Sequence, residues 1–299
     1  MRGVWAGISR FRGKTKAQSA MEYLMTYGWA ILIIAIVMVA LFELGIFNSA
    51  NFAPKATAGA CQVVRNVESV TLQGQCQGEL PMYVAVFDGK NSKVSIPSSG
   101  SINPANITIA AWINAASIPS STVRILGKES STSTNEYDMF HSSTVLGTRL
   151  TTTSGSNYYQ TPSPVAVNEW QFGTVTYQSS TNTIAVYLNG ALLGKSSASV
   201  KGALNGSVNP LYIGYGGPVY STYFDGYLSN IQIYNTTLSA NQIKELYTEG
   251  IGGAPIDPLH VVGWWPLNGN AQDYSGNSNN GQATAVSYTS AWTTGYAQP

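Results

Sequence analysis

Two kinds of hydrophobic pattern divide the chain. Residues 23–42 form an uninterrupted run of twenty residues without a charged side chain. At a rise of about 1.5 Å per residue, a helix of this length spans the roughly 30 Å hydrocarbon core of a bilayer. From about residue 83 onward, apolar and polar positions alternate in short runs that are rich in β-branched and aromatic residues. The first pattern predicts a membrane-length α-helix, and the second predicts β-strands.

The alternating runs predict an all-β body. They are YVAVFDG, SKVSIP, ITIAAWIN, STVRILGK, EYDMFH, WQFGTVTYQ, TIAVYLNG and LYIGYG, with turn residues between them. So many short strands favour two packed antiparallel sheets. One soluble helix is predicted after Leu238, where Ser239 and Gln242 form a capping box and Gly250 ends the helix. The tryptophans inside strand patterns are expected in the core: Trp112, Trp170, Trp264 and Trp265.

Basic residues precede the hydrophobic run and few follow it. No acidic residue stands before Ala17, whereas five basic residues do: Arg2, Arg10, Arg12, Lys14 and Lys16. This bias places the N-terminus in the cytosol and the rest of the chain outside. An ordinary secretory signal has a small-residue cleavage site after an apolar region of about 7–15 residues. Here the small residue, Ala17, stands before the run, and Glu22 lies at its edge.

The stretch KAQSAMEYLMTYGWAILIIAIVMVALFELGIF resembles the class III signal of archaeal type IV pilin-like proteins. The resemblance implies that a prepilin peptidase cuts between Ala17 and Gln18 and leaves the helix on the mature chain. Ala17 departs from the commonest residue of these signals, which is Gly. In such proteins Glu22, the fifth mature residue, would pair with the new α-amino group of Gln18 on the same or a neighbouring subunit. The alternative is a simple membrane anchor in which Glu22 is an interfacial residue.

Five segments follow from these patterns. They are a signal leader (1–17), a membrane or filament-core helix (18–47), a linker (48–55), a disulfide loop (56–81) and the β-body (82–299). Beyond the leader, ten basic residues stand against fourteen acidic ones, so this part of the chain has a net negative charge. Nothing in that balance indicates binding to nucleic acid.

An extracellular location agrees with the cysteines and the sequons. Cys61 and Cys76 are the two cysteines of the chain. A disulfide between them would close a loop of about 15 residues and stabilise the folded chain by about 3 kcal/mol. Two free thiols are the alternative, and a metal site would need more ligands. Asn106, Asn205 and Asn235 each begin a glycosylation sequon, which has meaning only in an exported chain.

The body resembles the laminin-G and concanavalin A-like jelly roll over residues 83–290. The resemblance is carried by FDGYLSNIQIYNTTLSANQIKELYTEG and by the preceding WQFGTVTYQSSTNTIAVYLNGALLG. The segment VVGWWPLNGNAQDYSGNSNNGQATAV resembles the strand that usually opens such domains, but here it comes last. Because chain ends often lie close together, we expect a circularly permuted jelly roll in which residues 261–267 pair beside an early strand such as 83–87.

Some jelly rolls of this class are glycosidases, which need two carboxyl groups about 5–9 Å apart in one groove. Glu136 and Asp138 are two residues apart on a predicted strand and share a side. The related glucanases carry a third carboxylate near the position where this chain has His141. We therefore expect these to be solvent-facing strand residues and expect no enzyme activity, with a surface glycoside hydrolase as the less favoured alternative.

A calcium site is a further hypothesis. DYSGNSNNG places Asp273, Ser275, Asn277 and Asn279 at alternate positions, a spacing that can wrap oxygen atoms around a hard cation such as Ca²⁺. An ordinary turn rich in Asn and Gly is the alternative. No other cofactor is expected.

Tyrosine rings in loop-like stretches are candidates for binding glycans, because an aromatic face with a polar tip suits a sugar. These are Tyr158, Tyr159, Tyr215, Tyr220 and Tyr223. The chain has eighteen tyrosines, so ordinary surface positions are the alternative.

Together these features predict a structural subunit of an archaeal type IV pilus-like surface filament. Its expected partners are identical subunits, the prepilin peptidase and assembly machinery, the membrane before assembly and surface glycans. The jelly roll would be displayed for adhesion. A membrane-anchored lectin that never polymerises is the alternative from the class of binding proteins.

Overall fold

The computed structural model describes residues 16–44, 46–47, 50, 52–129, 135–162, 165–197 and 201–299. The chain divides into two compact units, residues 1–49 and 50–299. Most of the expected leader lies outside the described residues. Helix α1 (Lys16–Glu43) includes Ala17, Gln18 and Glu22, but the side chains of residues 16–22 also lie outside the description.

The first unit contains the predicted membrane-length helix. Within α1, Tyr23–Glu43 has a mean hydropathy of 2.4, and none of its most apolar window is buried. The helix is therefore long and apolar enough to cross a bilayer, and the side chains of its most apolar window are exposed.

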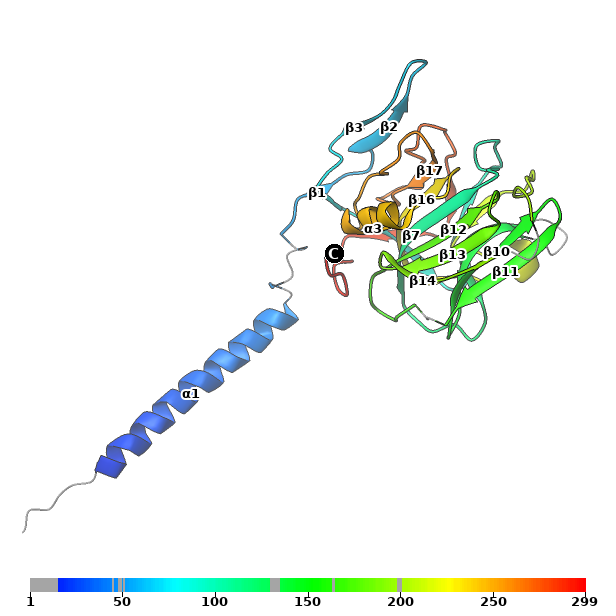
Figure 1. Ribbon diagram of the computed structural model, residues 1–299. Helices are drawn as coiled ribbons and strands as arrows, with labels where there is room; N and C mark the ends of the chain where they lie inside the picture. The colour runs from blue at the N-terminus through cyan, green and yellow to red at the C-terminus, as the bar shows by residue number, and fades with distance from the viewer. Residues whose placement is uncertain are drawn as a thin grey trace, which may run out of the picture. The chain divides into compact units, whose positions relative to one another are not determined.

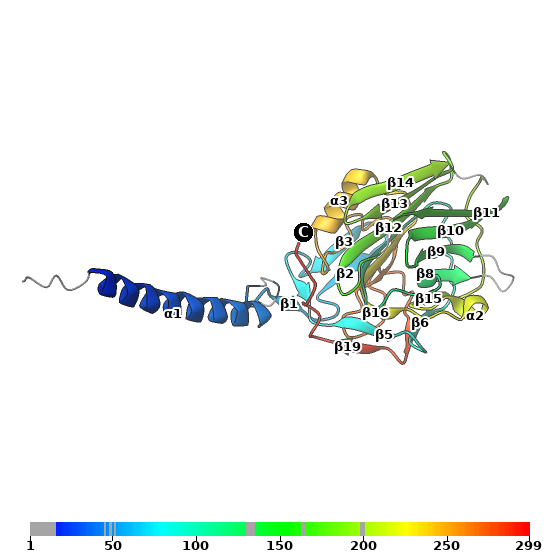
Figure 2. The same ribbon diagram turned by 90° about the horizontal axis from the view of Figure 1, so that it is seen from below.

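The second unit is a sandwich of two antiparallel sheets (Figures 1 and 2). Among the described residues, the seven-stranded sheet contains, in spatial order, β11 (Gly155–Thr161), β10 (Leu146–Thr152), β9 (Asn135–His141), β8 (Val123–Glu129), β15 (Leu211–Ile213), β6 (Lys93–Ile96) and β18 (Gln282–Thr284). The eight-stranded sheet contains β14 (Ala191–Ser197), β13 (Thr183–Leu188), β12 (Gln171–Gln178), β7 (Ile107–Ala115), β16 (Asp225–Tyr234), β5 (Val84–Asp88) and β19 (Ser287–Thr289), with β17 (Val261–Trp265) on β16. The predicted N-terminal helix and antiparallel two-sheet body are confirmed.

The central strands of the eight-stranded sheet, β12, β7 and β16, are buried on both faces. In β7 all nine residues are buried, because alternate side chains enter different cores. Ile109 and Ile113 enter the core between the two sheets, whereas Trp112 enters a second core on the opposite face. The four tryptophans predicted to be internal are at most 5% exposed: Trp112, Trp170, Trp264 and Trp265.

Helix α3 (Ala240–Thr248) covers the second core (Figure 1). Its N-cap is Ser239, whose side chain accepts a hydrogen bond from the backbone N–H of Gln242, while the side chain of Gln242 accepts one from the N–H of Ser239. The predicted capping box is confirmed. Ile243 and Leu246 of this helix are fully buried, and Tyr247 stacks on Trp112 with ring centroids 5.8 Å apart.

The C-terminal segment joins both sheets beside the first strands of the sandwich. β18 pairs with β6, and β19 pairs with β5. This closeness agrees with the expected circular permutation. The expected pairing of residues 261–267 with residues 83–87 is wrong, because β17 pairs with β16 instead. β16 is ten residues long and has β7 along one edge, so its other edge holds β5 at residues 225–228 and β17 at residues 231–234.

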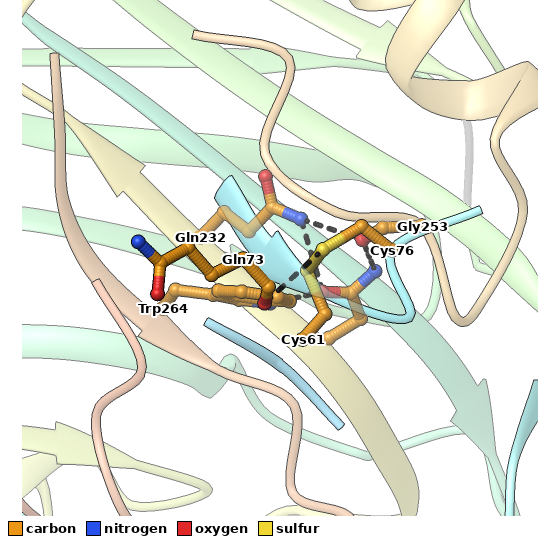
Figure 3. Close-up of a disulfide and its surroundings, with 7 residues drawn as sticks. Cys61, Gln73, Cys76, Gln232, Gly253 and Trp264 are labelled. Carbon is orange, nitrogen blue, oxygen red and sulfur yellow. Dashed lines mark hydrogen bonds between the residues drawn. A yellow bond between two sulfur atoms is a disulfide. The ribbon is translucent and has the colours of Figure 1, made fainter. Parts of the chain in front are cut away.

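The cysteine segment lies in the same compact unit as the sandwich. β2 (Cys61–Arg65) and β3 (Val70–Gly74) form a hairpin, and β1 (Lys55–Ala56) pairs in parallel with β4 (Leu80–Pro81). Cys61 and Cys76 form the expected disulfide, with 15 residues of sequence separation. Figure 3 shows this bond beside Trp264, and both cysteines pack against the second core. The backbone N–H of Val63 donates to the carbonyl of Tyr274 at 2.9 Å, which ties the hairpin to the C-terminal segment.

Candidate functional site

The outer face of the seven-stranded sheet, opposite the core between the sheets, carries an unusual set of polar and aromatic side chains. Strand alternation places them there: Leu146 and Leu150 of β10 enter the core, so Arg149 between them faces out. The same argument holds for Asp138, which lies between the core residues Tyr137 and Met139. Lys93, Arg124, Arg149 and Asp138 are the described charged residues that alternation and register place on this face. Lys128 pairs with Tyr137 and Leu211, two residues of the core between the sheets, so it lies on the core side of β8.

The two carboxylates proposed for hydrolysis are buried ion-pair partners. Glu136 lies 2.9 Å from Lys128 Nζ, and Asp138 lies 3.3 Å from Arg124 Nε. Glu136 and Asp138 are 2% and 0% exposed, so the expectation that they face solvent is wrong. Alternation along β9 alone could not reveal that Arg124 and Lys128 on the neighbouring strand β8 pair with these carboxylates.

Burial dominates the charge state of the first pair. Loss of water raises the pKa of Glu136 and lowers that of Lys128, even though the two side chains attract each other. The Lys128 ammonium also donates to the Asn103 side chain and to the carbonyl of Ser207, at 2.7 Å for the latter. Glycoside hydrolysis requires two carboxyl groups in one open groove, whereas both carboxylates of β9 are buried and ion-paired.

Arg124, Asp138, Arg149, Tyr158 and Tyr220 form what we call the arginine–tyrosine cluster. The guanidinium of Arg124 lies 3.7 Å from the centroid of the Tyr220 ring, and Arg149 donates to the Tyr220 hydroxyl. Arg149 also lies 5.5 Å from the ring centroid of Tyr158, which is 49% exposed. Tyr220 reaches this face from helix α2 (Gly217–Tyr220). Two of the predicted glycan-binding tyrosines thus meet around arginines that the sequence analysis did not single out.

Lys93, Tyr212, Tyr215 and Tyr223 form a second group, the lysine–tyrosine cluster. Tyr215 and Tyr223 stack with centroids 4.6 Å apart, and Lys93 Nζ lies 5.0 Å from the Tyr215 centroid. Desolvation raises the pKa of Tyr215, so its hydroxyl stays protonated at neutral pH. The remaining candidate, Tyr159, lies apart from both clusters because its side chain packs against the core between the sheets.

A polar cleft of about 540 Å³ opens next to the lysine–tyrosine cluster. Its lining includes Asp88, Ser117, His141, Thr222, Tyr223 and Asp225. Its volume is within the range of about 300–1,000 Å³ that small-molecule sites occupy. Asp88 is committed to its own turn, because its carboxylate accepts the backbone N–H groups of residues 90–92. These hydrogen bonds and one with the Ser92 side chain lower the pKa of Asp88.

His141 lies at the inner wall of this cleft. It is 2% exposed, and its Nδ1 atom has no hydrogen-bond partner among the described residues. Desolvation lowers the pKa of His141 to about 4, so the ring is neutral at physiological pH.

The four residues proposed for calcium binding lie in one network. The two oxygens of Asp273 accept hydrogen bonds from the backbone N–H groups of Trp264, Ser275 and Asn279 and from the Ser275 hydroxyl, at 2.8–2.9 Å. The amide of Asn277 donates to the carbonyls of residues 261 and 262. These bonds fix the loop onto β17. Calcium binding here stays a prediction, and no group of three or more His, Cys, Asp and Glu side chains suited to a metal occurs among the described residues.

The three sequons differ in exposure. Asn205 and Asn235 are exposed. Asn106 is half-buried, and its side-chain oxygen accepts hydrogen bonds from the backbone N–H and the hydroxyl of Ser179, both at 2.8 Å. Glycosylation of all three stays a prediction.

A family model described as the concanavalin A-like lectin/glucanases superfamily matches residues 88–244, which is more than half of the chain. The chain belongs to this superfamily. The match begins at the end of β5 and ends within α3, so the C-terminal strands β17, β18 and β19 lie outside it. None of the curated protein sequences matches this chain.

Solved structures of similar fold include a proposed carbohydrate-binding protein from Bacteroides ovatus. It is 18% identical, with a TM-score of 0.55 over 76% of this chain and 65% of that protein. A heptameric pentraxin from Limulus polyphemus is 18% identical over 69% of this chain and 94% of its own, with a TM-score of 0.49. A carbohydrate-binding module of a Ruminococcus gnavus sialidase, solved with α2,3-sialyllactose, is 12% identical over 56% of this chain and 100% of its own, with a TM-score of 0.46. At 18% identity, the similarity to the Bacteroides ovatus protein supports the fold of the sandwich and nothing further.

Proposed function

We propose that the chain is a structural subunit of an archaeal type IV pilus-like surface filament, with α1 in the filament core and the sandwich displayed outside. The observation that carries the proposal is the helix surface: Tyr23–Glu43 is strongly apolar, and its most apolar window has no side chain buried within the described chain. Apolar surface of this extent requires a non-aqueous partner. Lipid supplies that partner before assembly, and identical helices supply it afterwards in an open head-to-tail array.

The processing pattern distinguishes this proposal from plain anchoring. Ala17, Gln18 and Glu22 stand in the register of a class III signal. Glu22 is a carboxylate at the edge of an apolar segment, where an unpaired charge is unfavourable. The α-amino group that cleavage creates at Gln18 is the partner that we propose for it. The disulfide between Cys61 and Cys76 supports an oxidising location for the sandwich.

Binding of surface glycans is the proposed role of the displayed sandwich. Membership of the lectin/glucanase superfamily supports it, as do the exposed ring of Tyr158 and the polar cleft beside Tyr223. A second candidate function is a membrane-anchored lectin that stays monomeric in the bilayer. The same helix and the same family membership are compatible with it.

The N-terminus of the mature protein separates these two functions. Mass spectrometry of protein sheared from the cell surface should find Gln18 as the first residue, within filaments that need no detergent for release. An intact leader, or material that is found only in the detergent-soluble membrane fraction, would favour the anchored lectin.

Replacement of Glu22 tests the proposed assembly contact. Glu22→Ala should insert into the membrane normally but reduce filament yield at least about tenfold, because a charge-assisted hydrogen bond contributes about 1.5–3 kcal/mol. The matched control is Glu43→Ala, which removes the carboxylate at the other end of α1 and should leave the yield unchanged. Equal yields from the two variants would remove the proposed role of Glu22.

A further inference from the structure

Arg149 carries a positive charge that the described residues do not neutralise. Of the two arginines in the arginine–tyrosine cluster, Arg124 pairs with Asp138 at 3.3 Å, whereas Arg149 forms no ion pair within the described part of the chain. One of its guanidinium nitrogens donates to the Tyr220 hydroxyl. The cluster therefore contains two guanidinium groups and one carboxylate, and it has one positive charge in excess.

The rings around Arg149 hold its guanidinium beside an exposed aromatic surface. Its central carbon lies 5.3 Å from the ring centroid of Tyr220 and 5.5 Å from that of Tyr158. The Tyr158 ring is itself fixed, because it stacks on the buried Phe140 with a centroid distance of 5.3 Å and an interplanar angle of 9°. Tyr158 nevertheless remains 49% exposed. A ligand at this place meets a flat aromatic ring and a planar cation side by side.

The charge distribution of this face favours an anion. Among the described charged residues of the outer face, Asp138 pairs with Arg124, which leaves Lys93 and Arg149 as cations without an ion-pair partner in the described part of the chain. The chain beyond the leader has more acidic than basic residues, so this local excess of positive charge is opposite in sign to its surroundings. Such a patch attracts a negatively charged ligand.

Guanidinium and aromatic groups together match one chemical class. A guanidinium binds a carboxylate through two parallel hydrogen bonds, and the apolar face of a sugar ring packs on an aromatic ring. Gln160, which is exposed and accepts a hydrogen bond from the Tyr158 hydroxyl, adds a polar group next to that ring. Nucleic acid is a weaker fit, because its binding uses several phosphate contacts along a basic groove, whereas this cluster has a single unpaired arginine.

We propose that the arginine–tyrosine cluster binds the carboxylate of an acidic saccharide, with Arg149 holding the carboxylate and Tyr158 contacting the sugar ring. This proposal deepens the glycan-binding role given above and rests on it. It assigns the specificity for charge to Arg149 on β10, whose register partner on β11 is Tyr158.

Two oligosaccharides that differ only in charge test the proposal. Binding of oligogalacturonate and of the fully methyl-esterified oligogalacturonate of the same length is measured by calorimetry on the full chain, in filaments or in detergent. The acidic form should bind at least tenfold more tightly, and its affinity should fall as NaCl rises. Equal affinities, no binding of either probe, or stronger binding of a single-stranded oligonucleotide would overturn the proposal.

Substitutions assign the binding to this cluster. Arg149→Gln should weaken binding of oligogalacturonate at least tenfold and leave any binding of the ester unchanged. The affinity of Arg149→Lys for oligogalacturonate should lie between those of the parent and Arg149→Gln, because lysine keeps the charge but lacks the planar pair of donors. Lys201→Gln, which removes one charge from an exposed lysine outside the clusters, is the control and should bind normally. Tyr158→Ala, at an exposed position, should also lose at least about fivefold, and it serves as the test if the Arg149 variants do not fold.

The outcomes separate this inference from the proposed function. If Arg149→Gln and Tyr158→Ala both bind oligogalacturonate as the parent does, the inference is wrong, whether or not the chain forms filaments. If the leader proves uncut but binding depends on Arg149, the filament is wrong and the acidic-saccharide site stands on an anchored lectin.

Discussion

Helix α1 and the β-sandwich place their large apolar side chains in opposite surroundings. In α1, Trp29 is 65% exposed and Leu24 is 79% exposed. In the sandwich, Trp265 is fully buried, and its indole N–H donates to the carbonyl of Asn279 at 2.9 Å. The two units have the same kinds of residue, so hydrophobicity alone does not define a core. The sandwich buries these side chains in its own cores, whereas the exposed apolar surface of α1 favours a non-aqueous partner.

The strongest way to sharpen this comparison is to remove one tryptophan from each unit. Trp265→Ala should lower the free energy of unfolding of the sandwich by about 3–5 kcal/mol, because it empties a large fully buried site. Trp29→Ala should change the same quantity by less than about 0.5 kcal/mol, because Trp29 is an exposed residue of the other compact unit. Both values are measured by urea denaturation of the full chain in detergent.

A large loss of stability from Trp29→Ala would contradict the comparison, because it would show that the sandwich depends on the helix. The opposite result for the second variant would also contradict the comparison. If Trp265→Ala hardly changes the free energy of unfolding, the core between the sheets does not determine the stability of the second unit.

The sequence predicted the elements better than it predicted their neighbours. An uncharged run of twenty residues specifies a helix by itself, and alternation specifies a strand with a core side and an outer side. Both signals are local. Which strand lies beside which depends on contacts between distant residues, so residues 261–267 were recognised as a strand but assigned to the wrong partner. Nothing local shows that β16 is long enough to pair with both β5 and β17 along one edge.

The candidate site shows the same limit. Tyr158 and Tyr220 could be proposed from their residue type, but their meeting at Arg149 requires β10, β11 and α2 to be placed in space. The sequence around Arg149 does contain a local signal. Leu146 and Leu150 lie on the core side of β10, so alternation places Arg149 on the outer side. Glu136 and Asp138 were expected to face solvent because charged residues usually do. Their burial follows from cations on the neighbouring strand, a pairing that strand alternation cannot reveal.

A buried histidine makes the stability of the sandwich depend on pH. Desolvation lowers the pKa of His141 to about 4 in the folded chain, against an ordinary value of 6.5. Between these two pH values the unfolded chain binds a proton at this histidine and the folded chain does not. Stability should therefore be complete above pH 6.5 and should decline as pH falls from 6.5 towards 4, by about 3 kcal/mol for a shift of this size. Equilibrium unfolding of the full chain measured over this range provides the test.

His141→Gln should flatten the decline between pH 6.5 and 4, because glutamine does not titrate. The comparison with the parent isolates the imidazole from Glu136 and Asp88, whose shifted pKa values are present in both proteins. His260→Gln is the matched control, since His260 is the other histidine of the chain and its side chain is 43% exposed. A variant at His141 that keeps the full decline would assign the pH dependence to other groups.

The smallest expected effect comes from the comparison of helices α1 and α3. α3 has nine residues, too few to be stable alone in water, so it depends on its capping box and on the packing of Ile243 and Leu246. Ser239→Ala removes the cap and should lower the stability of the sandwich by about 1 kcal/mol, whereas Ser239→Asp, which keeps an oxygen acceptor at the N-cap, should stay near the parent. Urea denaturation of the parent, Ser239→Ala and Ser239→Asp measures these differences.

α1 has 28 residues, and we expect its stability to depend on its length and on a non-aqueous partner. A substitution at Ser239 should therefore leave filament yield unchanged while it destabilises α3. If Ser239→Ala and Ser239→Asp are equally unstable, the hydrogen bond at the cap does not hold this helix in place, and packing alone explains its stability.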